Sequence, residues 1–385
     1  MSRIRIIITI IVVVLTTLLT GCTGKEPNEI AYVVALGIDS TDDDNYKITI
    51  QYANTTQISG GASESGGKAG SEIVDNVTIE APNIYAGVGL ANNIVSKSFS
   101  MSHAKLIVFS KEVAEKGVKD MIETLVRSEE IRPDVFIAVA NTTANDYLTS
   151  VNPEMEVNPA QYYQLIYQKN QLVGIPDGQL REFFTGLYTD NYDSILPVAG
   201  VIEGSGGNSQ NDDKGQSKDS QNEGSEGSSE SLDSFESKNS DENEKEKDAE
   251  KNTSKYEYDI KNYVGGETAI EKKNKAEAIG AAVFEKDKMV GELGEVETEI
   301  CKMLKGDYTY SYLTYYNNDT PDIPITVKTT QQKKPKYKID TDKKTVDIEL
   351  YIESDLYSLP ADYNVENKIE DFERDVANYT SSTYK

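Results

Sequence analysis

Continuous and alternating apolar stretches in the first half of the chain predict a set of β-strands. Residues 30–39 (IAYVVALGID) form a continuous apolar run of strand length. Residues 46–53 alternate between apolar and polar side chains, as expected of a strand with two different faces. The acidic residues 42–45 between these stretches are typical of a hairpin loop. Two further apolar runs predict strands at residues 104–110 and 134–140.

Helical periodicity appears in three places between and after these strands. A helix is predicted near Pro82, because a proline suits the first turn of a helix. A second helix begins at Lys111, with one apolar stripe that continues to Leu125. The pair Asn158-Pro159 suits the N-cap and first position of a third helix. The apolar face of this third helix is predicted to comprise Tyr162, Leu165 and Ile166.

Beyond residue 275 the pattern predicts a hairpin followed by a helix. Residues 278–285 and 288–293 form the two expected strands. The helix begins near Glu295, and its inward positions are predicted to be Val296, Ile300 and Met303. Cys301 lies at the edge of this stripe, so we expect a buried, unreactive thiol there.

Two stretches near the C-terminus alternate along their length and predict further strands. Residues 307–316 alternate tyrosines with smaller side chains. Residues 345–353 place four apolar side chains on one face: Val346, Ile348, Leu350 and Ile352. A helix is predicted from Asn364. The order strand, strand, helix and then a run of strands indicates an α+β chain with several domains, in which mixed β-sheets are flanked by helices.

A polar segment divides the chain. Residues 204–253 are rich in Gly, Ser, Asp and Glu and hold almost no bulky apolar side chains, so they cannot bury enough surface to offset the entropy of ordering. We therefore predict a disordered acidic linker at 203–258. It separates an N-terminal region at 22–202, with room for two α+β subdomains, from a C-terminal α+β domain at 259–385. Residues 1–21 are predicted to be a signal peptide.

The N-terminus has the pattern of a lipoprotein signal. Arg3 and Arg5 precede an apolar run at residues 6–19, and about 14 residues are too few for the roughly 20 of a spanning helix. The run suits the apolar region of a secretion signal. It ends at Leu-Thr-Gly-Cys, residues 19–22, a lipobox. We therefore predict lipid attachment at Cys22, which becomes the first residue of the mature chain, outside a bacterial cytoplasmic membrane. The alternative is an ordinary signal peptide with an incidental cysteine.

Charge narrows the classes of partner. The chain has 39 basic and 65 acidic residues and a net charge of −26. Nucleic acids and anionic lipid headgroups repel such a chain, so nucleic acid is excluded as a partner and membrane binding is expected to rest on acyl chains. Cys301 is the one other cysteine in the sequence. If Cys22 carries lipid, Cys301 has no partner for an internal disulfide.

The residue types offer little for catalysis. His103 is the single histidine, and it precedes a predicted strand without a nucleophile-elbow pattern nearby. One imidazole cannot form a histidine-based metal site, and the acidic cluster at residues 42–44 lacks the spacing of a calcium loop. Gly37 and His103 are expected to be structural. We therefore predict no catalytic residue, no metal, no cofactor and no enzyme.

Three motifs resemble one known family. The lipobox followed by residues 35–39 (ALGID) is similar to the opening of the C subunits of spore germinant receptors, the Ger(x)C lipoproteins. Residues 102–109 (SHAKLIVF) and then 127–132 (RSEEIR) resemble a strand, helix and R-x-x-E-I-R segment of that family, with Ser and Ala in place of the usual Gly and Leu. Residues 282–293 (AVFEKDKMVGEL) are similar to a third segment.

The resemblance implies a non-enzymatic lipoprotein subunit of a three-component nutrient receptor, needed for germination, on the outer face of the inner membrane of a dormant endospore. Its implied partners are a membrane-embedded A subunit, a transporter-like B subunit and the lipid bilayer through the acylated N-terminus. The family fold is three α+β domains. Relatives usually continue beyond the position of Lys385, which implies a short or truncated C-terminal domain.

Two other classes of protein share some of these features. A solute-binding surface lipoprotein of a transporter would have the same anchor and a soluble body. Such proteins usually show regular βαβ units around a cleft between two lobes, whereas strands cluster here. A surface hydrolase is disfavoured because the sequence has a single histidine.

Overall fold

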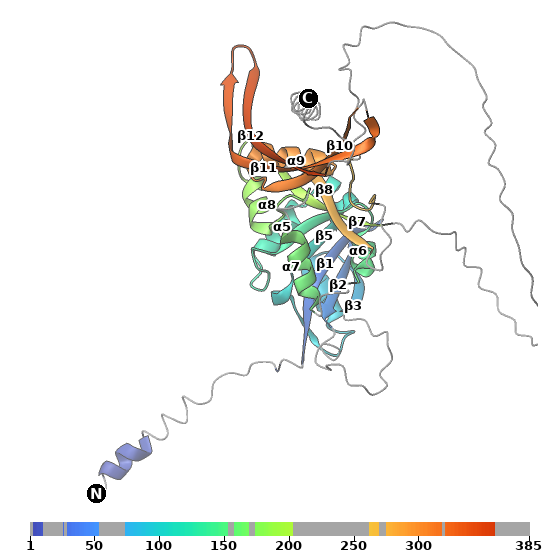
Figure 1. Cartoon of the computed structure of the whole chain (residues 1–385). Coiled ribbons are helices and arrows are strands. Elements are labelled where there is room, and N and C mark those ends of the chain that lie inside the picture. Colours follow the sequence, from blue (N-terminus) through green and yellow to red (C-terminus); the bar gives the residue numbers. More distant parts are fainter. Residues whose placement is uncertain are drawn as a thin grey trace, which may run out of the picture.

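Figure 1 shows the computed structural model as a body of helices and strands from which a two-stranded arm projects. The predicted lipobox at 19–22, the linker at 203–258 and the helix from Asn364 lie outside the described residues. No helix among the described residues is long and apolar enough to cross a membrane. The structure describes residues 3–10, 26, 29–53, 74–152, 158–168, 174–202, 262–268, 275–317 and 320–358.

Four parallel strands form the centre of the main sheet. They are β1 (Ile30–Ser40), β5 (Leu106–Ser110), β6 (Phe136–Ala140) and β7 (Ser194–Val201). Their apolar runs are buried on both faces, which explains why β1, β5 and β6 read as continuous apolar sequence instead of alternating. The strand order in this part of the sheet is β1-β5-β6-β7, and β4 (Ser98–Ser100) pairs with the start of β1.

Antiparallel strands extend the sheet at both edges. β2 (Tyr46–Ala53) pairs with β1 through the predicted hairpin, and β3 (Val74–Ala81) pairs with β2. At the other edge, β8 (Ala276–Glu285) pairs with β7, and β9 (Lys288–Leu293) pairs with β8. The sheet is therefore mixed and flanked by helices, in agreement with the predicted α+β class.

The hairpin of β8 and β9 crosses the predicted division of the chain. The sequence predicts this hairpin in a separate domain at residues 259–385, but both strands complete the sheet that the N-terminal region begins. The predicted boundary follows the change in composition. A change in composition does not report which strands pair with each other across the polar segment.

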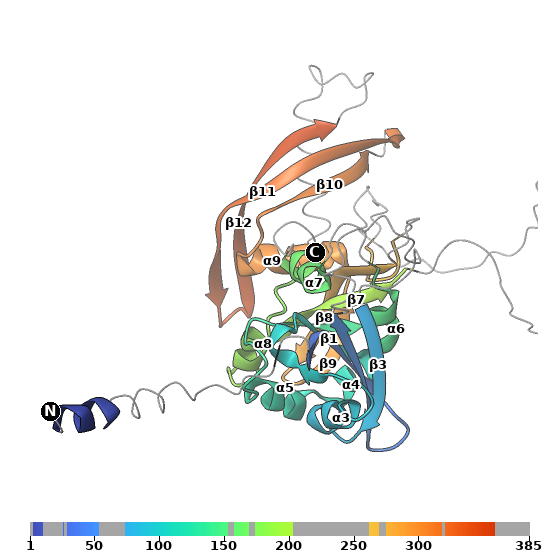
Figure 2. The same cartoon turned by 90° about the horizontal axis from the view of Figure 1, so that it is seen from below.

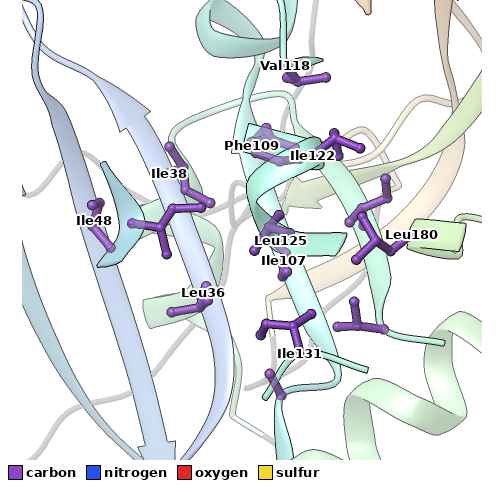
Figure 3. Close-up of a cluster of buried hydrophobic side chains, with 14 of the residues drawn as sticks. Leu36, Ile38, Ile48, Ile107, Phe109, Val118, Ile122, Leu125, Ile131 and Leu180 are labelled. Carbon is purple, nitrogen blue, oxygen red and sulfur yellow. The ribbon is translucent and has the colours of Figure 1, made fainter. Parts of the chain in front are cut away.

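Helices cover both faces of this sheet. On one face lie α3 (Ile84–Ala91), α4 (Lys111–Lys116), α5 (Lys119–Val126) and α8 (Leu180–Leu187). On the other lie α6 (Ala144–Ser150) and α7 (Pro159–Gln168). Figure 3 shows Leu36, Ile38, Ile107 and Phe109 from the strands on one side of this core. They meet Ile122, Leu125 and Leu180 from the helices and Val118, the N-cap of α5.

The helices predicted within the described residues are found, with differences. Helix α3 begins at Ile84, after Pro82, and its N-cap is Asn83. The single helix expected from Lys111 is two helices, because Gly117 ends α4 with φ 121°, a conformation that side chains other than glycine rarely adopt. Helix α7 begins as predicted, with the amide of Ala160 donating to Asn158 Oδ1 at 3.0 Å. Its buried face agrees only in part: Tyr162 is buried as predicted and Ile166 is half-buried, but Leu165 is exposed. Tyr163 and Tyr167 are buried instead.

A second sheet packs against the body through one helix. β10 (Tyr310–Asn317), β11 (Thr320–Asp340) and β12 (Thr345–Ser358) are antiparallel. Figures 1 and 2 both place α9 (Glu295–Lys305) between this sheet and the rest of the body. The predicted strand is found in β12, but its two faces do not differ in burial: Val346 and Ile348 are 55% and 45% exposed, and Leu350, Tyr351 and Ile352 are all half-buried.

Candidate functional site

The ALGID segment holds helix α6 against strand β1. Leu36 and Ile38 join the core on one face of the sheet, and the alternate positions face α6. A Cβ on Gly37 would lie 3.0 Å from Leu148 Cδ1 and 3.1 Å from Ala144 Cβ. Gly37 is inside the strand with an ordinary φ and not at its end, so the reason for glycine is the close approach of α6.

Asp39 ends the same segment and caps α6. Its two carboxylate oxygens accept hydrogen bonds from the amides of Ala144 at 2.6 Å and Asn145 at 3.0 Å. A carboxylate at a helix N-terminus satisfies amides that have no partner within the helix and interacts favourably with the helix dipole. Burial raises the pKa of Asp39, and the two amide hydrogen bonds oppose that rise. Asp39 therefore has a structural role, because it connects the end of β1 to the start of α6.

The second motif is tied together by one carboxylate. Glu130, within residues 127–132, accepts a hydrogen bond from the amide of Met101 at 2.6 Å, just before β5. Ser128 Oγ accepts from the amides of Glu130 and Ile131, each at 3.1 Å, and so fixes the turn that carries the carboxylate. Glu130 therefore connects the segment before β5 to the turn that follows α5.

The third motif fastens the last two strands of the main sheet to α4 and α5. The amide of Val118 donates to the Asp287 carbonyl in the β8–β9 turn at 3.0 Å. Lys111 Nζ lies 2.9 Å from Glu292 Oε1 of β9, and this partner raises the pKa of the Lys111 ammonium. The hairpin therefore closes over the same helix pair that the second motif holds.

A cleft of about 420 Å³ lies where α9 meets the main sheet. One wall comes from residues 176–196, around α8 and the start of β7, and the other from residues 302–309, at the end of α9. Its apolar lining includes Phe183 and Leu196. No local pattern in the sequence indicates this cleft, because its walls lie more than 100 positions apart.

Buried charged groups of α9 lie next to this cleft. Glu299 and Lys302 are only 5% and 6% exposed, although the predicted inward positions were Val296, Ile300 and Met303. Of these three, Met303 is buried and the other two are half-buried. Burial raises the pKa of Glu299 to about 7 and lowers that of Lys302 to about 8. Ser311 Oγ donates to Glu299 Oε2 at 2.9 Å, which links α9 to β10.

Comparison with known families identifies the chain. Residues 24–201 match the family described as spore germination protein N-terminal domain. Residues 279–385 match the family described as spore germination B3/GerAC like, C-terminal. The two matches follow each other in order and together cover most of the sequence. The chain belongs to the Ger(x)C family of spore germination proteins.

Relatives of this Ger(x)C protein carry germination names. Spore germination protein KC of Bacillus subtilis is 26% identical over 176 residues, which are 42% of this chain and 43% of that protein. Spore germination protein B3 of the same organism is 26% identical over 148 residues, 36% of each chain. Spore germination protein GerQC of Bacillus cereus is 26% identical over 104 residues, 27% of this chain and 29% of that protein. Each match spans less than half of the relative.

One solved structure was matched. The crystal structure of the GerBC protein aligns with a TM-score of 0.40 and 14% identity, covering 90% of this chain and 80% of that chain.

The residues singled out in the sequence fall at structural positions or outside the described part. His103 is exposed in a short 3-10 turn, with its ring 4.7 Å from that of Tyr32 in an edge contact and Ser102 Oγ 3.1 Å from Nδ1. The free Cys301 thiol is half-buried and not fully buried as predicted, and this burial raises its pKa, which disfavours the reactive thiolate. The described residues hold no group of metal-ligating side chains. Cys22 lies outside them.

Proposed function

We propose that this Ger(x)C protein is a non-enzymatic lipoprotein subunit of a nutrient germinant receptor in the endospore inner membrane. Its partners are a membrane-embedded A subunit and a transporter-like B subunit, and lipid at Cys22 holds it on the outer face of that membrane. The observation that supports this proposal best is the match of both germination families in order along one chain. The three motifs that resemble the family add support, because their residues form contacts that hold neighbouring helices and strands of the fold together.

The anchor and the fold fit together geometrically. Residues 23–29 alone separate Cys22 from the start of β1 at Ile30, a tether of about 25 Å at most when extended. Figure 1 shows the start of β1 at the opposite end of the body from the arm of β11 and β12. A lipid at Cys22 would therefore hold the β1 end of the body near the bilayer and direct the arm away from it.

Cys22→Ala is expected to release the protein from spore membranes or leave it as an unprocessed precursor. The chain carries a net charge of −26, so anionic headgroups repel it, and stable retention requires a two-chain lipid anchor. Membrane and soluble fractions of spores, probed for the protein and for its size, give the result directly.

Cys301→Ala is the matched control, because it removes the other thiol and leaves the lipobox unchanged. It should stay in the membrane fraction at the wild-type level. A processed Cys22→Ala protein that remains fully membrane-bound would show that lipid at Cys22 is not the anchor.

A further inference from the structure

The turn that follows helix α3 lies at the end of the main sheet where the chain enters the fold. Strand β4 pairs in parallel with the first residues of β1, with Ser98 opposite Ile30. Parallel strands start at the same end of a sheet, so the turn at residues 92–97 before β4 lies beside the start of β1. Ile94 precedes Ser98 by four positions, a reach of at most about 14 Å. The turn is therefore close to the segment that would carry the lipid.

Two large apolar side chains are exposed at this turn. Leu90, near the end of α3, is 48% exposed, and Ile94 is 69% exposed. The amide of Ile94 donates to the carbonyl of Ala91 at 3.0 Å, so a helical turn continues past the last residue of α3. Residues four positions apart in such a turn lie on the same side. Leu90 and Ile94 therefore form one exposed apolar surface, the α3 patch.

Hydrogen bonds hold the α3 patch on the outside of the body. Asn92 Oδ1 accepts from the amide of Phe99 in β4 at 2.8 Å. The amide of Asn92 donates to the carbonyl of Val88 at 3.1 Å. Val88 and Ala91, on the inner side of α3, belong to the core. The turn is thus fixed from both sides, and Leu90 and Ile94 stay exposed within the described structure.

The stretch that contains the α3 patch differs in charge from the rest of the chain. Residues 81–111 include no aspartate or glutamate, although 65 of the 385 residues are acidic. Anionic headgroups repel the chain as a whole because of its negative charge. This stretch contributes no such repulsion. It can therefore approach a bilayer more closely than the acidic surfaces of the chain can.

We propose that the α3 patch is a membrane-contact surface, with Leu90 and Ile94 inserted between lipid headgroups beside the acylated N-terminus. The inference rests on the proposed lipid at Cys22. Residues 23–29 alone separate that cysteine from β1, so this end of the sheet stays within about 25 Å of the lipid. Burial of the two apolar side chains is favourable there. The lipid retains the protein, and the α3 patch fixes which side of the body faces the bilayer.

Fluorescence quenching in vesicles tests the proposal. The full lipidated chain, in a Cys301→Ala background, is reconstituted into vesicles of phosphatidylglycerol and phosphatidylethanolamine. A fluorescent label is attached at Ile94→Cys or, as the matched control, at Ile339→Cys. Both isoleucines are 69% exposed, and Ile339 belongs to the arm, at the opposite end of the body from the start of β1. The acylated thiol of Cys22 takes no label.

The two labels should respond differently to lipids that carry a nitroxide near the top of the acyl chain. The label at position 94 should lose about half of its fluorescence or more, because interfacial segments lie about 5–10 Å deep. The label at position 339 should keep its fluorescence. Vesicle-bound protein with an unquenched label at position 94 would overturn the membrane contact and leave the anchor intact. Protein that does not stay with the vesicles would contradict both the anchor and the contact.

A charged substitution gives a second measurement. Ile94→Asp should reduce the quenching of a label at Leu90→Cys at least about twofold, because a carboxylate is costly to move out of water. Ile339→Asp should leave that quenching unchanged. Both isoleucines are exposed, so these variants are expected to fold, as circular dichroism will show. Equal quenching in the two variants would show that the α3 patch does not enter the bilayer. A label at position 94 that is shielded from aqueous iodide in spore membranes, but unquenched in vesicles, would assign the α3 patch to a receptor subunit instead.

Discussion

Gly37→Val is expected to lower the free energy of unfolding by about 2–3 kcal/mol, the cost of forcing extra atoms into a packed interior. The first added atom already lies 3.0 Å from Leu148 Cδ1 and 3.1 Å from Ala144 Cβ, and valine adds two more. Helix α6 would have to move away from β1. That movement would also lengthen the hydrogen bonds from Ala144 and Asn145 to Asp39. Denaturant unfolding of the purified protein measures the loss.

Gly89→Ala is the matched control for this prediction. Gly89 lies on the exposed side of α3, and a Cβ there would have no atom within 4 Å. Alanine is the better helix former by about 1 kcal/mol, so the control should be neutral or slightly stabilising. Equal stability of the two variants would show that α6 does not need the space above Gly37.

Glu299→Gln is expected to remove a pH dependence of stability. The pKa of Glu299 rises from an ordinary 4.5 to about 7 in the folded chain, mainly by burial and also by the charge of Glu295, against the opposing effects of Ser311 and Lys302. Between these two values the unfolded chain is ionised while the folded chain keeps its proton. The folded state therefore loses about 3 kcal/mol of stability as the pH rises from about 4.5 to about 7.

This loss should appear as a difference in the free energy of unfolding between Glu299→Gln and the wild-type protein. Between about pH 5 and pH 7.5, the stability of Glu299→Gln relative to wild type is expected to increase by about 2 kcal/mol. The range stops short of the pKa of Lys302, which burial lowers to about 8. Glu115→Gln, on the exposed side of α4, should follow the wild type at every pH. A difference that stays constant for Glu299→Gln would mean that Glu299 is ionised in the fold.

The strands of the main sheet could be predicted because their patterns are local. Residues 30–39 and 104–110 read as continuous apolar runs, and both are strands buried on two faces. The strand β3 was missed, since its alternation follows a Gly- and Ser-rich stretch and includes few large apolar residues. The helices α6 and α8 were missed as well, because each has fewer than nine residues and too few turns to show a clear period.

The candidate cleft and the buried charges could not be predicted for a different reason. Periodicity assigns polar residues to the solvent, and so it placed Glu299 and Lys302 on the outside of α9. Their burial arises from a second contact, in which β10 and β11 cover that face of the helix through Ser311 and Gln331. Contacts between segments far apart in sequence leave no periodic signal, whereas the motifs of the family could be recognised as short strings of residues.

Purification of the tagged protein from the inner membrane of spores, after crosslinking, tests the receptor role most directly. Mass spectrometry of the purified material should identify one membrane-embedded A subunit and one transporter-like B subunit, in amounts similar to that of the Ger(x)C protein. Cys22→Ala should lose both, because it no longer reaches the bilayer that holds them. Membrane-retained wild-type protein that purifies without either subunit, or with a permease and an ATPase instead, would contradict the account.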